Sequence, residues 1–133
     1  MERIDKYDYW KDIAEYDLAT AEAMYNTGRW LYVVFMCQQA IEKLCKGLYV
    51  FYADDNIPRS HNINFIINKF SDTLSFEIND MQLKLFERLT AFYIEGRYPE
   101  YKEKLSVSIN KGTAEQILNE TKEAFKCLLM WKI

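Results

Sequence analysis

The chain has 133 residues, half of them hydrophobic and 16% aromatic, which is enough to build the core of one domain and too apolar for a disordered chain. Its formal net charge of −3 gives no overall attraction for nucleic acid, so any phosphate-binding site must be local. Only four Gly and two Pro interrupt the chain, which favours long helices over a turn-rich β fold. We therefore predict a single all-α domain over residues 1–133.

Two long helices are expected in the first part of the chain. Apolar residues recur at helical spacing over residues 5–26, and Gly28 is a natural helix stop. Asp17 falls inside the apolar stripe of this helix, where a carboxylate is unexpected. A second helix, about residues 30–53, must return antiparallel because the connection is short. It is apolar nearly all round, which is typical of a buried helix.

A short third helix and a long fourth helix follow. Ser60 is expected to cap the short helix, which ends at about residue 69 or 70. Asn79 followed by Gln82 resembles a capping box that opens the fourth helix, which runs to about Glu95.

The last helix is expected after a polar connection. Residues 97–112 are weakly periodic and contain Pro99, so we predict no helix there. Thr113 followed by Gln116 is then the expected cap of the last helix. No strand-like alternation competes with these helices. The predicted architecture is an up-and-down bundle of four long helices plus one short helix.

The cysteines and the apolar runs bear on location. Cys37 and Cys45 would lie about 12 Å apart along one helix, too far to be bridged. With Cys127 this predicts three free thiols, as in a cytoplasmic protein. No apolar run approaches the roughly 18 residues that span a bilayer, so we expect no membrane contact.

Several kinds of chemistry are excluded by residue type. A single histidine excludes multi-histidine zinc sites and paired-histidine catalysis. The sequence has no Gly-rich phosphate loop, no serine nucleophile elbow and no Rossmann fingerprint. The cysteines lack the closely spaced pairs of a zinc site. We therefore expect neither a metal nor a cofactor.

The buried second helix carries a polar stripe. Its members, at spacings of three and four, are Gln39, Glu42, Lys43 and Lys46. Charges on a buried helix cost free energy unless they are paired or used. An ion pair between Glu42 and Lys46 at i and i+4 is one interpretation, but it accounts for only two of the four residues. The alternative is that the stripe belongs to a shared polar site.

Four other polar residues are candidates for the same site. They are Asp17 in the first helix, His61 near the start of the third, and Arg97 with Tyr98 at the end of the fourth. Structural roles are also open. His61 could be a cap or a surface residue, whereas Arg97 could interact with a helix dipole and Tyr98 could cover the core.

Four motifs occur in an order that resembles a known family. They are Ala-Glu-Tyr-Asp-Leu-Ala at 14–19, Cys-Gln-Gln-Ala-Ile-Glu-Lys at 37–43 with Lys46, Ser-His-Asn-Ile at 60–63, and Tyr-Ile-Glu-Gly-Arg-Tyr-Pro at 93–99. Gly-Arg-Trp at 28–30 follows the first motif. Together they resemble the HEPN family (higher eukaryotes and prokaryotes nucleotide-binding domain) over essentially the whole chain.

The resemblance implies a helical bundle that usually dimerises. In bacteria and archaea such proteins are often encoded beside a minimal nucleotidyltransferase, as a toxin–antitoxin-like pair. Many HEPN proteins resemble ribonucleases with an Arg followed five to seven positions later by a His. No arginine of this chain meets His61 at that spacing. We therefore expect a non-catalytic module that binds a nucleotide or nucleic-acid phosphate, pairs with a nucleotidyltransferase, or does both.

The leading hypothesis gives each candidate residue a role in phosphate binding. Lys43, Lys46 and Arg97 would supply cationic donors, and Tyr98 could stack on a base. The residues that would orient the cations are Asp17, Gln39 and Glu42.

Two alternatives remain open. In the first, a buried ionic network of Asp17, Glu42, Lys43 and Arg97 is purely structural, and the function lies in pairing with a nucleotidyltransferase. In the second, the protein is a ribonuclease with a non-standard site, in which Arg97 stabilises phosphate charge and His61 or Tyr101 transfers protons.

A homodimer is the expected assembly. Trp30, Tyr32, Phe35 and Val50 would otherwise leave an apolar patch beside the second helix, and a two-fold interface is the commonest way to cover one. The family resemblance points the same way.

Overall fold

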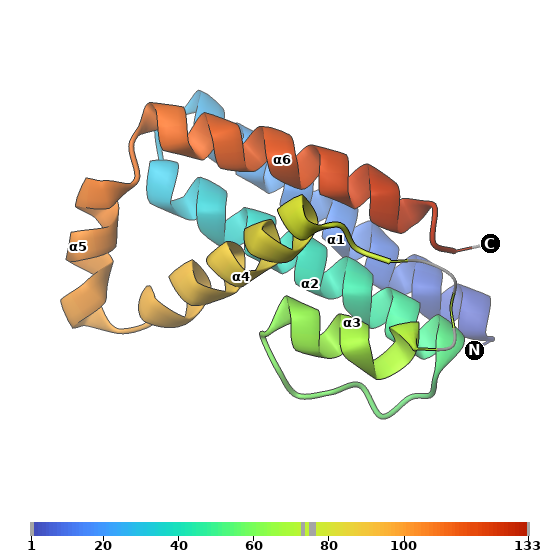
Figure 1. Ribbon diagram of the computed structural model, residues 1–133. Coiled ribbons are helices and arrows are strands. Elements are labelled where there is room, and N and C mark those ends of the chain that lie inside the picture. The colour runs from blue at the N-terminus through green and yellow to red at the C-terminus, as the bar shows by residue number, and fades with distance from the viewer. Residues whose placement is uncertain (1, 73, 75–76, 133) are drawn as a thin grey trace.

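The computed structural model describes residues 2–72, 74 and 77–132, with all side chains in these ranges except those of residues 95, 99, 101–103 and 106. These residues form six helices and no strand, which confirms the all-α fold. The helices are α1 (Arg3–Asn26), α2 (Trp30–Tyr52), α3 (Ile63–Ser71), α4 (Asp80–Glu95), α5 (Pro99–Ser108) and α6 (Lys111–Leu129). The four long helices α1, α2, α4 and α6 run alternately toward opposite ends, so both termini lie at one end of the bundle (Figure 1).

Helix α2 is the centre of the bundle. All five other helices pack against it, and α4 crosses it obliquely (Figure 1). Ile41, Leu44 and Leu48 are fully buried on this helix. Because other helices surround α2, apolar residues are favourable on nearly every side of it. For the same reason, each buried polar side chain on α2 needs a hydrogen-bond or ion-pair partner.

The turn between α1 and α2 depends on a glycine. Gly28 has φ +76°, a left-handed conformation that costs glycine little and other residues more. The chain reverses there within three residues, which makes α1 and α2 the antiparallel neighbours that the sequence predicts.

The caps of α3 and α6 differ from the predicted ones. Asn62, not Ser60, caps α3, because its side-chain oxygen accepts a hydrogen bond from the backbone amide of Phe65 at 3.2 Å. Asn110 caps α6 in the same way, accepting from the amide of Thr113 at 2.9 Å. In both cases an asparagine close to the expected residue satisfies the free amides of the first turn.

The capping box of α4 is confirmed. The side chain of Asn79 accepts from the amide of Gln82, and the side chain of Gln82 accepts from the amide of Asn79, at 2.8 and 3.1 Å. Leu85 and Leu89 of this helix are buried, whereas Met81 in its first turn is 67% exposed.

The prediction that residues 97–112 form no helix was wrong. Helix α5 begins at Pro99, where a proline is favourable because the first helical amide has no partner in any case. Leu105 is buried near the end of this helix, and most of its other described side chains are exposed. The helix therefore lacks the apolar stripe that would have revealed it in the sequence.

The described helices include none with both the length and the apolar character needed to cross a membrane.

Candidate functional site

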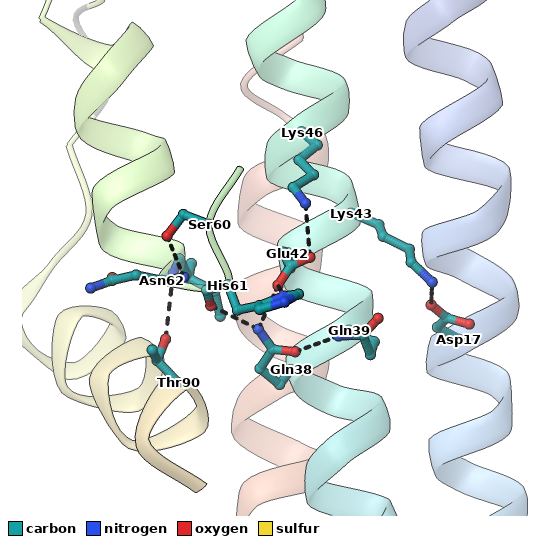
Figure 2. A network of polar contacts seen from close by, with 11 residues as sticks. Asp17, Gln38, Gln39, Glu42, Lys43, Lys46, Ser60, His61, Asn62 and Thr90 are labelled. Carbon is teal, nitrogen blue, oxygen red and sulfur yellow. Dashed lines mark hydrogen bonds and ion pairs between the residues drawn. The ribbon is translucent and has the colours of Figure 1, made fainter. Parts of the chain in front are cut away.

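A buried carboxylate on α2 is the centre of the polar residues. Glu42 is 3% exposed, and its two oxygens accept hydrogen bonds from three groups (Figure 2). Oε1 lies 2.9 Å from both Gln38 Nε2 and His61 Nδ1, and Oε2 lies 3.0 Å from Lys46 Nζ. The ion pair predicted between Glu42 and Lys46 is confirmed. The three donors around the buried carboxylate offset the free-energy cost of burying its charge.

His61 is held in one orientation by this carboxylate. Because an ionised carboxylate only accepts hydrogen bonds, Nδ1 must carry the proton directed at Glu42, which leaves Nε2 for other contacts. The side chain of His61 is 39% exposed, whereas that of Glu42 is 4% exposed. The network therefore fixes the ring from the buried side and leaves part of it open to solvent.

Gln38 is a member of the network that the sequence analysis did not select. It is fully buried on α2, and its amide nitrogen donates to both Glu42 and the backbone carbonyl of His61, each at 2.9 Å. Its carbonyl oxygen accepts from Gln39 Nε2 at 2.8 Å. Gln38 thus ties the segment before α3 to α2. The spacing of four residues between Gln38 and Glu42 was the signal that could have identified it.

A second ion pair lies on the other side of α2. Lys43 Nζ is 2.7 Å from Asp17 Oδ2 on α1, and Asp17 is 7% exposed (Figure 2). The carboxylate inside the apolar stripe of α1 is therefore explained by a lysine that reaches it from α2. The polar stripe of α2 is therefore divided. Lys43 pairs with α1, whereas Glu42 contacts His61 in the segment before α3 and pairs with Lys46 on its own helix.

Arg97 joins the site through an aromatic ring. The guanidinium carbon lies 6.0 Å from the centroid of the Tyr93 ring, within cation–π range. The ring of His61 lies 4.9 Å from the same Tyr93 ring. Tyr93 therefore connects the buried Glu42–His61 pair to an exposed cation. Its position in the last turn of α4, four residues before Arg97, was the available sequence signal.

The end of α4 is fixed against α2 by a close contact. A Cβ atom at Gly96 would lie 2.0 Å from Cζ of Phe35, so a side chain there requires Phe35 to move. Phe35 also packs edge-on against Tyr93, with ring centroids 6.0 Å apart. The absence of a side chain at Gly96 thus allows Phe35 to pack closely against the end of α4, next to Tyr93.

The other predicted site residues differ in position. Tyr98 is the residue before α5 and is 55% exposed, so it is open to solvent near Arg97 in the chain. The side chain of Tyr101 lies outside the described side chains. The charges of Lys43 and Lys46 are each paired with a buried carboxylate. Whether these residues bind a ligand stays a prediction.

Two further features concern metals and assembly. Among the described His, Cys, Asp and Glu residues, no group of three is placed to hold a metal ion. Of the residues on which the dimer prediction rested, Val50 is buried, Trp30 and Phe35 are partly buried, and Tyr32 is 40% exposed. Part of the expected patch is thus covered within one chain, and dimerisation stays a prediction.

Comparison with known proteins assigns the family. The HEPN domain model matches residues 7–131, nearly the whole chain, so the protein belongs to the HEPN family. The crystal structure of TT1696 from Thermus thermophilus has a similar fold, with a TM-score of 0.78 at 18% sequence identity. That match covers 94% of this chain and 97% of the other. No curated protein matched.

Proposed function

We propose that this HEPN-domain protein binds a phosphate group of a nucleotide or nucleic acid, without catalysis, beside His61, Tyr93 and Arg97. The observation that carries the proposal is the continuous series of contacts from a buried carboxylate to an exposed guanidinium. Glu42 orients His61, His61 packs on Tyr93, and Tyr93 supports Arg97.

The chemistry of these groups suits a phosphate ester. Arg97 is exposed and carries a planar fork of N–H donors that matches two phosphate oxygens. Because Nδ1 of His61 already donates to Glu42, Nε2 would donate to a phosphate oxygen in the doubly protonated form of the ring. Lys43 and Lys46 are each paired with a carboxylate of the protein. They would attract the phosphate through their positive charge, or bind it directly after leaving Asp17 and Glu42. Tyr98 would supply a stacking surface for a base.

Titration of ATP, GTP and a short single-stranded RNA against the protein tests the proposal. Arg97→Ala should weaken binding by about tenfold or more, because a hydrogen bond to a charged group contributes about 1.5–3 kcal/mol. Arg88→Ala is the matched control. Arg88 is an exposed arginine on α4, the helix that precedes Arg97, and its guanidinium carbon lies 5.6 Å from the Phe92 ring centroid. Absence of binding at millimolar ligand, or equal weakening by both substitutions, would contradict the proposal.

A ribonuclease with a non-standard site is the second candidate. The observation that favours it is the buried carboxylate that fixes the tautomer of His61, because general acid–base catalysis by histidine needs such an orienting group. Arg97 would stabilise the negative charge that develops on the phosphate. Cleavage of single-stranded or structured RNA that both His61→Ala and Arg97→Ala abolish would favour this candidate over simple binding.

Pairing with a minimal nucleotidyltransferase is compatible with either role. It is supported by family membership. A nucleotidyltransferase encoded by the adjacent gene that co-purifies with the protein would support it, and separate elution of the two proteins at micromolar concentration would oppose it.

A further inference from the structure

The outer side of α1 carries a row of acidic residues. Helix α1 packs against α2 and α6 and lies behind them in Figure 1, away from α4 and α5. The carboxylates exposed on its other side are Asp5, Asp8, Asp12, Glu15 and Glu22. The two lysines within this stretch, Lys6 and Lys11, are half-buried. Over residues 5–22 six carboxylates and two lysines give a formal net charge of −4, compared with −3 for the whole chain, so negative charge is concentrated on this helix.

Much of this charge has no counterion within the protein. Glu22 lies 2.8 Å from Lys122, and Glu15 lies 3.7 Å from Lys11. Asp8 and Asp12 make no ion pair in the part of the chain that the structure describes. The pKa of Tyr7, raised to about 12 chiefly by burial, is also raised by the charges of Asp8 and Glu15.

Two large aromatic side chains lie among these carboxylates. Tyr9 is 57% exposed and Tyr16 is 75% exposed. They are seven residues apart, which places them on the same side of the helix at a separation of about 10 Å. A tyrosine ring offers both apolar area and a cation–π surface, and tyrosine is enriched where proteins bind one another.

An apolar groove opens at one end of this surface. Tyr9, Trp10, Val50 and Ile57 line a cavity of about 330 Å³ between α1 and the connection after α2. Lys6 and Asp55 also line the groove and are paired with each other at 2.7 Å, so this lysine does not offset the acidic row. The groove can receive an apolar side chain from a molecule that lies along α1.

We infer that this surface of α1 binds a positively charged amphipathic segment of a second protein. Lys or Arg side chains of that segment would face Asp8, Asp12 and Tyr16, and an apolar side chain would enter the groove beside Tyr9. A second copy of this chain in a two-fold contact through α1 would bring the same negative charge to the surface, and a nucleic acid would bring its phosphates. Charge complementarity therefore selects a basic protein segment. The inference is independent of the phosphate site beside Arg97.

Fluorescence anisotropy with a labelled synthetic peptide tests the inference. The probe is an amphipathic helical peptide with Lys and Arg on one face and Leu on the other. A peptide of the same composition in scrambled order is the control. Tyr16→Ala should weaken binding of the amphipathic peptide by about two- to fivefold, the size of one exposed cation–π contact. Adding Tyr9→Ser, which also alters the groove, should weaken it further.

Glu123→Gln is the matched charge control for Asp12→Asn. The side chain of Glu123 is 77% exposed on α6, away from this surface. Asp12→Asn should weaken binding more than Glu123→Gln, and nucleotide binding should be unchanged in all of these variants. The inference is overturned if the peptide does not bind at about 100 µM. It is also overturned if the scrambled peptide binds equally well, or if the α1 variants bind like the wild type.

Discussion

Removal of the buried carboxylate at the centre of the site should cost a large part of the stability of this protein. Glu42→Ala removes the acceptor of the Lys46 ammonium and of His61 Nδ1, and it leaves the Gln38 amide only its bond to the carbonyl of His61. Loss of one partner of a buried ion pair costs about 3–5 kcal/mol. Because the Lys46 side chain keeps 15% exposure and can be partly hydrated, we expect the lower part of that range, about 3–4 kcal/mol.

The expected change in melting temperature follows from the size of the chain. At about 2.1 cal/mol/K per residue, 133 residues give an unfolding entropy of about 0.28 kcal/mol/K. A loss of about 3–4 kcal/mol then lowers the melting temperature by about 10–15 °C. Thermal unfolding followed by circular dichroism measures it directly.

Glu15→Ala is the matched control. Glu15 also pairs with a lysine four residues away on a helix, but at 3.7 Å and with both side chains more than a third exposed. Such a pair contributes about 0.3–0.5 kcal/mol, so the melting temperature should fall by only about 1–2 °C. Similar small shifts for both variants would refute the view that the Glu42 network is a compensated buried charge.

Two other predictions concern packing and thiol reactivity. Gly96→Ala should destabilise the protein by about 1–3 kcal/mol in denaturant unfolding, because the new methyl group displaces Phe35. Gly112→Ala, whose Cβ would lie 3.5 Å from its nearest neighbour, should be neutral or stabilising, and equal effects would contradict the packing argument. A thiol reagent at neutral pH should modify the exposed Cys127 and neither cysteine of α2, since both are buried and burial raises the pKa of Cys37 to about 12. Modification of a second thiol in the folded protein would contradict this, and Cys127→Ser should abolish the native reaction.

The sequence predicted the features that depend on neighbours along the chain. The apolar period placed Asp17 on the buried side of α1, where it is found, and the i, i+4 spacing predicted the pair of Glu42 and Lys46. The capping box of α4 also depends on residues three apart, and it is present. These contacts are fixed by helix geometry alone.

Features that depend on how helices are rotated and packed could not be read from the sequence. The partner of Lys43 is 26 residues away, and that of His61 is 19 residues away on Glu42. Tyr93 has a role only because α4 crosses α2 near His61. Helix α5 was not predicted because few of its described side chains are buried, so its sequence has no apolar period.

Nuclear magnetic resonance of the single histidine tests the central claim most directly. His61 is the only histidine of the chain, so its ring signals need no assignment by mutation. Titration with ATP, GTP or single-stranded RNA should shift the Nε2 and Cε1–H signals of the wild type. The Nδ1 proton should keep its hydrogen bond to Glu42, and Arg97→Ala should suppress the ligand-induced chemical-shift change. Ring signals that do not move at millimolar ligand would contradict phosphate binding beside His61 and Arg97.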